Sequence, residues 1–356
     1  MKYLALPAAL ILLISCQGNL KEKMKPEHAG TDWAYYKLNG DIHTISERSV
    51  KISNGTATEG IENSTEMDYD RTFDDFGNLI HEKKWAKKDI PYEELISERR
   101  DAIIKRSQYT AGKLTIITTN EWDAAKEHLS DTKRSNPDDT QIDREAFIYK
   151  DGRLTSKTKY NSQDIAIEKT VYTYNKKGNL VQEDIYPNAI SAEFTIIYAY
   201  DKNNNKTLVT RTGKSSPLQK TAYAYNGNKV TGITSTNGKG ETSYTEALNY
   251  DSKGNVIQHS TAENASGSKT SERFQYDSKN NTTKWQTVTD SDPEVTITNT
   301  YDAENNLTGT KTLIGTEVFD NRTYIYEYDT MKNWIKKTVN IKGIKSFEVT
   351  RTITYF

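Results

Sequence analysis

The sequence predicts an all-β fold in which hairpin repeats build an extended antiparallel sheet of about 20 strands, curled or solenoid-like in form. One short motif, or phrase, occurs eleven times in the 356 residues: a tyrosine or phenylalanine followed by a turn sequence. The last eight copies lie 25 to 27 residues apart. Each closes a run in which apolar and polar residues alternate, which is typical of a strand. A fixed period of this length is typical of repeat proteins. The tyrosines that mark the regular repeats are Tyr149, Tyr174, Tyr200, Tyr225, Tyr250, Tyr276, Tyr301 and Tyr328.

Residues 1–15 predict a lipoprotein signal peptide. Lys2 supplies a positive start, and residues 4–14 form an apolar stretch too short to span a bilayer. The stretch ends next to Cys16, the only cysteine, in a pattern that resembles the lipobox of bacterial lipoproteins. The resemblance implies that Cys16 becomes a lipidated N-terminus whose acyl chains hold the protein on a membrane. Inner-membrane lipoproteins carry aspartate where this chain has Gln17, so the resemblance implies the outer membrane, with either its periplasmic or its outer face exposed.

The rest of the chain divides into a polar segment and two sets of repeats. Residues 16–35 predict the lipidated cysteine and a flexible tether, residues 36–146 irregular repeats with insertions, and residues 147–356 regular repeats. Only 34% of residues are hydrophobic and 23 are tyrosine, so we expect each residue to bury little surface and both faces of the sheet to be exposed to water. Forty-eight basic and 49 acidic residues are interspersed. A nucleic-acid partner would require a concentrated basic face, so none is expected.

One regular repeat illustrates the predicted hairpin. Tyr172 and Tyr174 lie two residues apart and therefore share one face of a strand. The turn opens at Asn175, whose side chain can accept backbone N–H groups two residues further on. It closes at Gly178, because glycine adopts a positive φ without strain, and Gly254 holds the same position in its repeat. We therefore expect a ladder of tyrosines along one face of the sheet, in which each aromatic cross-strand pair stabilises the sheet by about 0.2 to 1 kcal/mol.

Some repeats depart from this pattern. Lys332 stands at the glycine position of the last repeat, which predicts a looser or differently built turn. Glycines stand closer to Tyr149 and Tyr225 than to the other tyrosines, which predicts shorter turns after these two residues.

The irregular part repeats the phrase at wider steps. Copies at Tyr36, Phe73 and Tyr109 each lie 36 to 40 residues before the next copy, so we expect the extra residues to loop out. The insertion at 91–106 favours a longer strand pair over a helix. The insertion at 123–143 is charged and contains an Asn-Pro step, which favours a loop.

Two phrases carry a family resemblance. Residues 174–180, Tyr-Asn-Lys-Lys-Gly-Asn-Leu, and residues 250–256, Tyr-Asp-Ser-Lys-Gly-Asn-Val, resemble the YD repeat of RHS-type proteins. The resemblance covers residues 36–356. Such proteins include large secreted toxins whose repeats form a hollow β-shell, cell-surface proteins and small envelope lipoproteins. A shell requires a much longer chain, and the repeat phrasing continues to residue 356, so the resemblance implies a repeat lipoprotein without toxic cargo.

The sequence offers no recognisable catalytic or metal-binding motif. Its histidines are dispersed, without the spacing of metal ligands or of a catalytic triad, and we expect them to be exposed. Equivalent turn aspartates repeat along the chain, whereas acid–base catalysis needs groups whose pKa values differ. We therefore expect no enzyme, no cofactor and no metal site. The histidines are His28, His43, His81, His128 and His259.

The sequence leaves three functional hypotheses. The first is a non-enzymatic, lipid-anchored envelope protein whose sheet binds or scaffolds polysaccharide or protein, with Trp285 and Trp334 as possible binding residues. The second is an accessory or immunity-like component of an RHS-type contact-dependent toxin system. The third is a hydrolase with its site in the irregular part, 36–146.

Overall fold

The computed structural model describes residues 31–59, 68–87, 90–99, 103–110, 112–125, 127–214 and 218–356. In these residues one short helix, α1 (Asp32–Tyr35), precedes 25 strands. Of the described segments, no helix has the length and apolar composition needed to cross a bilayer. The strands are β1 (Ile42–Ser53), β2 (Thr56–Glu59), β3 (Asp68–Phe73), β4 (Leu79–Lys87), β5 (Ile90–Arg99), β6 (Ile103–Thr110), β7 (Lys113–Trp122), β8 (Leu129–Ser135), β9 (Gln141–Lys150), β10 (Arg153–Tyr160), β11 (Ala166–Tyr174), β12 (Leu180–Tyr186), β13 (Phe194–Tyr200), β14 (Lys206–Gly213), β15 (Gln219–Asn226), β16 (Lys229–Thr236), β17 (Thr242–Tyr250), β18 (Val256–Glu263), β19 (Lys269–Tyr276), β20 (Thr282–Thr289), β21 (Val295–Tyr301), β22 (Leu307–Ile314), β23 (Glu317–Tyr328), β24 (Trp334–Ile341) and β25 (Ile344–Tyr355).

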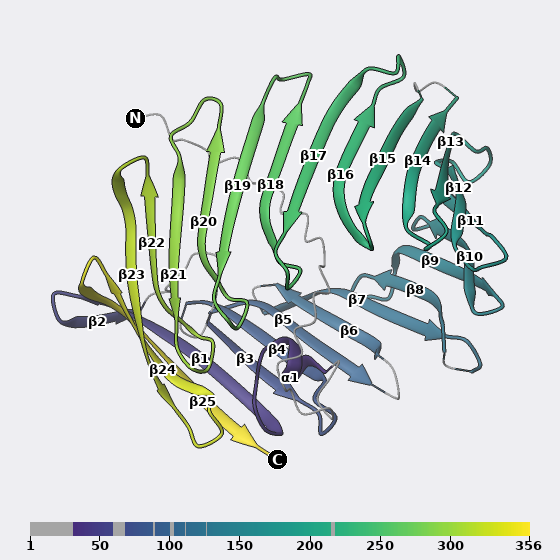
Figure 1. Ribbon diagram of the computed structural model, residues 1–356. Helices are drawn as coiled ribbons and strands as arrows, with labels where there is room; N and C mark the ends of the chain where they lie inside the picture. Colours follow the sequence, from purple (N-terminus) through teal and green to yellow (C-terminus); the bar gives the residue numbers. More distant parts are fainter. Residues whose placement is uncertain are drawn as a thin grey trace.

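The strands form a closed antiparallel barrel, so the predicted open, solenoid-like sheet of about 20 strands is wrong. From β3 to β25 each strand pairs with the next along the chain. Strand β25 then pairs with β1, and β1 pairs with β3, which completes a ring of 24 strands. The short β2 pairs with the far end of β1. Figure 1 shows β25 lying beside β1, where the two ends of the sheet meet.

The wide steps of the irregular part hold extra strands, so the prediction that these residues loop out is wrong. From Phe73, at the end of β3, to Tyr109, in β6, the chain forms three strands, β4 to β6. From Tyr109 to Tyr149, in β9, it forms three more, β7 to β9. In the regular part, each step from one repeat tyrosine to the next covers only two strands. Because antiparallel strands alternate in direction, the turn after Tyr109 lies at the opposite end of the barrel from the other repeat turns.

The two insertions have different outcomes. Strands β5 and β6 confirm the predicted strand pair at 91–106. The loop predicted for 123–143 is wrong in part, because β8 and the start of β9 occupy residues 129–135 and 141–143. The Asn-Pro step falls in the turn between these two strands.

The repeat turns follow the predicted chemistry. Gly178 and Gly254 have φ of 89° and 96°. Lys332 has φ of 68°, and the backbone N–H of Lys332 donates to the carbonyl of Asp329, as the N–H of Gly254 does to Asp251. The looser final turn is therefore a wrong prediction. The shorter turns after Tyr149 and Tyr225 are confirmed, since two residues separate β9 from β10 and β15 from β16.

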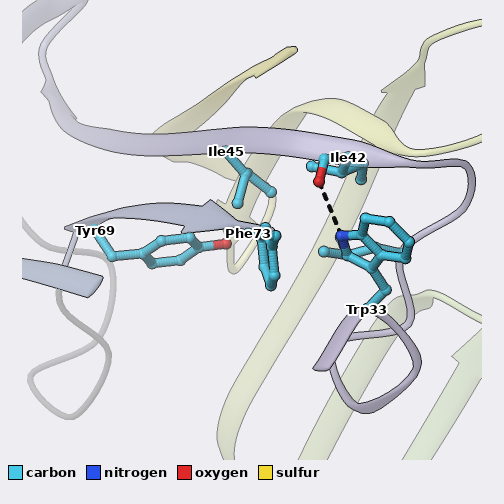
Figure 2. Packing of buried hydrophobic residues seen from close by; sticks show 6 residues of the cluster. Trp33, Ile42, Ile45, Tyr69 and Phe73 are labelled. Carbon is cyan, nitrogen blue, oxygen red and sulfur yellow. Dashed lines mark hydrogen bonds between the residues drawn. The ribbon is translucent and has the colours of Figure 1, made fainter. Parts of the chain in front are cut away.

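The main hydrophobic core lies where α1 packs on the first strands. Figure 2 shows Trp33 of α1 beside Ile42, with Ile45, Tyr69 and Phe73 around them. The Trp33 indole N–H donates to the carbonyl of Ile42 over 2.9 Å. At residue 77, in the β3–β4 turn, a Cβ would lie 2.5 Å from the Trp33 ring, so glycine is required there. The core therefore fixes the start of the described chain against the β3–β4 turn.

We predict that Phe73→Ala lowers the free energy of unfolding by about 3 to 5 kcal/mol, because Phe73 is fully buried and its loss leaves a cavity. Denaturant titration followed by tryptophan fluorescence measures the loss. The control is Phe319→Ala, since Phe319 is 65% exposed and its removal is expected to change stability by less than about 0.5 kcal/mol. Equal effects of the two substitutions would contradict the assignment of the core.

Candidate functional site: the tyrosine face

One face of the barrel carries the repeat tyrosines together with charged side chains. Residues paired across neighbouring strands share a face, so the register traces it around the sheet. Leu248 pairs with His259, His259 with Glu272, and Phe274 with Trp285. We call this surface the tyrosine face. The other face of the same strands carries small residues, which include Thr245, Ala247, Ser260, Ala262 and Ser271.

The repeat tyrosines act as hydrogen-bonding clamps between hairpins. The β12–β13 ladder ends at Gln182 and Ile197, so the carbonyl of Leu180 lies beyond it. The hydroxyl of Tyr200, at the end of β13, donates to that carbonyl over 2.7 Å. Six more tyrosine hydroxyls make the same kind of bond over 2.8 to 3.0 Å. The pairs are Tyr174 with Leu154, Tyr225 with Lys206, Tyr250 with Val230, Tyr276 with Val256, Tyr301 with Thr282, and Tyr326 with Leu307.

Two repeat tyrosines have other partners. The hydroxyl of Tyr328 donates to the Asp302 carboxylate and accepts from the side chain of Asn306. The ring of Tyr149 lies 4.6 Å from that of His128. In these two repeats the tyrosine side chain therefore contacts the neighbouring turn instead of a strand carbonyl.

The turn aspartates are structural caps. Asp201 Oδ1 accepts the backbone N–H groups of Asn203 and Asn205, and its Oδ2 accepts from the Asn205 side chain over 2.9 Å. Hydrogen bonding, first from the Asn205 side chain and also from the backbone, lowers the pKa of Asp201. The side chain of Asn179 extends to Asn204 of the next turn over 3.1 Å. Within the described part of the chain, no group of three or more His, Cys, Asp or Glu side chains is placed to hold a metal ion.

Trp285 belongs to a continuous polar network on strands β17 to β20. Its indole N–H donates to Glu272 Oε1 over 3.0 Å, and Glu272 Oε2 lies 2.8 Å from His259 Nδ1. His259 Nε2 lies 2.9 Å from Glu246 Oε1, and the hydroxyl of Tyr244 donates to Glu246 Oε2 over 3.0 Å. The histidine is half-buried between two carboxylates, so the prediction that it is exposed is wrong.

A sequence signal for this network exists and was missed. Residues 246, 259, 272 and 285 each lie 13 positions apart, which is half a repeat, or one strand and one turn. At that spacing, successive residues stand on neighbouring strands. The half-repeat spacing in the sequence therefore predicts that these four side chains lie close together.

The network shifts the pKa values of its members. The hydrogen bond that the His259 ring donates to Glu272 is the largest cause that raises the pKa of His259 above its ordinary value of 6.5, and the charge of Glu246 adds to it. The same hydrogen bond lowers the pKa of Glu272. Burial and then the hydrogen bond to Glu246 raise the pKa of Tyr244 to about 12. Both ring nitrogens of His259 face carboxylate oxygens, and this arrangement favours the protonated form of the histidine.

Trp334 lies in a second network, at the seam where the barrel closes. The guanidinium of Arg351 lies 3.4 Å from the centroid of the Trp334 ring, and its Nε lies 2.8 Å from Glu47 Oε2. Tyr69 donates to the same carboxylate oxygen over 3.0 Å, and the Arg71 guanidinium lies 3.8 Å from the centre of the Tyr69 ring. These contacts join β24, β25, β1 and β3. Trp334 is thus covered by Arg351 and does not meet Trp285 in one site.

The remaining predicted site residue, Cys16, lies outside the described residues, as does His28.

Comparisons with known proteins give weak likenesses. No protein-family model and no curated protein matches the chain. A crystal structure of TcdB2-TccC3-TEV has 13% identity and a TM-score of 0.40, with 83% of this chain and 17% of that chain covered. The Tc holotoxin pore of Photorhabdus luminescens has 12% identity and a TM-score of 0.30 over 85% and 18%. A porin-like protein of Bacteroides uniformis has 11% identity and a TM-score of 0.21 over 89% and 98%. This chain therefore spans less than a fifth of the length of the first two.

We predict that Tyr200→Phe lowers the free energy of unfolding by about 1 kcal/mol, because the Leu180 carbonyl loses its donor. Chemical denaturation measures the change. Tyr35→Phe is the matched control, since Tyr35 is 77% exposed and its hydroxyl is expected to add nothing measurable. A Tyr200→Phe protein as stable as the wild type would show that the clamp does not stabilise the barrel.

We predict that His259→Asn removes a pH-dependent part of the stability. A raised histidine pKa stabilises the fold fully below pH 6.5, and this contribution disappears as pH rises through the folded-state pKa. The lowered Glu272 pKa stabilises above pH 4.5, and that contribution disappears in acid. Thermal unfolding from pH 5 to pH 9 should show the wild-type Tm falling more steeply above pH 6.5 than that of the variant. Parallel Tm curves would contradict this account.

Proposed function

We propose that the chain is a non-enzymatic, lipid-anchored protein of the bacterial outer membrane, and that its barrel binds polysaccharide on the tyrosine face. The lipobox-like sequence at Cys16 and the YD-like phrases support the anchored repeat protein. The observation that carries the binding function is Trp285, whose ring is oriented by a hydrogen bond to Glu272.

The surroundings of Trp285 suit a sugar. Flat aromatic rings stack on the apolar faces of sugar rings, and carboxylates accept hydrogen bonds from hydroxyl groups. Phe274 pairs with Trp285 across the strands, and the ring of Phe274 lies 6.5 Å from that of Tyr276. Because Glu272 already fixes the indole, less side-chain freedom would be lost on binding.

The same network supports a binding role over a catalytic one. Glu246 and Glu272 both bond to His259, and each also accepts a bond from a second side chain, Tyr244 or Trp285. Acid–base catalysis by two carboxylates requires one to be protonated and the other to be ionised. Here both carboxylates face the same histidine, and the hydrogen bond to that histidine lowers the pKa of Glu272.

We assign Trp334 a structural role in closing the barrel, and not a role in binding polysaccharide. Arg351 covers its ring, and the ring of Tyr326 lies 5.9 Å away. A sugar could stack on it only by displacing Arg351 from Glu47. The proposed binding residue is therefore Trp285, and Trp334 serves as a structural control.

We predict that Trp285→Ala weakens capture of the cognate polysaccharide by about tenfold or more, equivalent to ~1.4 kcal/mol. Trp334→Ala should still bind but should unfold at a lower temperature, because the seam loses a cation–π contact. Retention on a panel of immobilised polysaccharides, with Tm measured in parallel, tests both. Saturable binding unaffected by Trp285→Ala, or no retention by any polysaccharide, would contradict the proposal.

A further inference from the structure

The strands around Trp285 carry their positive and negative charges on opposite faces. Figure 1 shows β17 to β22 side by side, and the glutamates of these strands lie on the tyrosine face. Glu246 and Glu272 contact His259, and Glu263 is paired with Tyr244. The basic residues of the same strands lie on the other face, where they are paired with Ala262, Gln258, Gln275 and Thr298. These basic residues are, in the same order, Lys269, Arg273, Lys284 and Lys311.

The tyrosine face around Trp285 is therefore acidic. All residues of β17 to β22 are described, and none of those on this face is a lysine or an arginine. His259 supplies at most one positive charge, against the two carboxylates that its ring nitrogens face over 2.8 and 2.9 Å. With both carboxylates ionised, the network stays negative whether or not the histidine is protonated.

The basic side chains of the two flanking strands have other partners. On β16, the Nζ atom of Lys229 lies 5.3 Å from the centre of the Tyr250 ring. On β23, the Nε atom of Arg322 lies 2.8 Å from Asp320 Oδ2. Neither of these strands contains a second lysine or arginine. The flanking strands therefore do not neutralise the glutamates beside Trp285.

The ring of Trp285 also differs from two other tryptophan rings in what lies over it. The Arg351 guanidinium lies 3.4 Å from the centroid of the Trp334 ring. The Nζ atom of Lys83 lies 4.8 Å from that of the Trp85 ring. Among the described residues, no lysine or arginine lies over Trp285 in this way, although aromatic faces attract cations. A cationic group of a ligand can therefore take the position over Trp285 that Arg351 takes over Trp334.

We propose that the Trp285 site binds a polysaccharide whose sugars carry protonated amino groups, in preference to a neutral or an acidic one. The proposal rests on the proposed function and names the class of polysaccharide for the same site. In the described chain each oxygen of Glu272 takes part in one hydrogen bond, whereas a carboxylate oxygen can accept two. An ammonium group can therefore donate a charge-assisted hydrogen bond to Glu272 and contact the indole ring. A carboxylated sugar would meet like charges and no basic side chain, which disfavours its binding.

The test compares two matched sugars, a glucosamine oligomer and an N-acetylglucosamine oligomer of the same length and linkage. Acetylation removes the positive charges and keeps the sugar backbone. Binding to the full chain is measured in buffer acidic enough to protonate the amines, where the lowered pKa of Glu272 keeps its carboxylate ionised. We expect the glucosamine oligomer to bind more tightly than the acetylated one by about tenfold or more. Polygalacturonate, an acidic polysaccharide, should not be retained.

Charge variants show whether the glutamates cause the preference. Glu272→Gln keeps an oxygen that can accept from the Trp285 indole but removes the charge, so the preference for the glucosamine oligomer should largely disappear. Glu246→Gln should act in the same direction. The matched control is Lys311→Gln, which removes a charge from an exposed position on the other face of β22 and should leave the preference unchanged. Circular dichroism melting checks that each variant folds.

The outcomes separate this proposal from the proposed function. Equal binding of the two oligomers, or tighter binding of polygalacturonate, that is lost in Trp285→Ala would overturn this proposal and leave the proposed function intact. A preference that survives in both Glu272→Gln and Glu246→Gln would also overturn it, because the carboxylates would not be its cause. No retention of any polysaccharide would contradict the proposed function and this proposal together.

Discussion

The pairing of β1 with β25 is the constraint on which the rest of the barrel depends. A hairpin repeat has little stability by itself, and an open sheet exposes the unpaired backbone of its edge strands. Here the first and last long strands of the described chain pair from Ile42 with Tyr355 to Lys51 with Phe347. Arg351 and Glu47 reinforce the join from the tyrosine face. Closure removes both edges and gives every repeat two neighbours.

Hydrogen bonds between repeats compensate for a small core. Among the described residues, the fully buried hydrophobic side chains are few, and most gather around Phe73 near the seam. Elsewhere the sheet is thin, with water-accessible side chains on both faces. Tyrosine hydroxyls bond the carbonyls that the ladders leave free, and asparagine side chains join neighbouring turns. Since each bond stabilises by about 1 kcal/mol, their repetition around the ring matters more than any one of them.

The sequence predicted the hairpin and its turns well, because these depend on local chemistry. Positive φ at Gly178 and Gly254 and the short turns after Tyr149 and Tyr225 follow from residues next to one another. Closure could not be predicted, since the pairing of Glu47 with Arg351 joins distant parts of the chain through side chains that no motif marks. The wide steps before Tyr109 and Tyr149 suggested loops because length alone does not distinguish a loop from a third strand. The network at His259 was visible only at half-repeat spacing.

The most direct test of the account is a disulfide across the seam. Thr44 and Thr354 are paired on β1 and β25, and their hydroxyl oxygens lie 2.6 Å apart. In a chain carrying Cys16→Ser, the substitutions Thr44→Cys and Thr354→Cys should form a disulfide under mild oxidation, because paired residues have suitable Cα separations. The bond would appear as a mobility shift on a non-reducing gel. A control pair of Thr44→Cys with Thr310→Cys, on β22, should not form one. Free thiols at 44 and 354 in the folded protein would contradict the closed barrel.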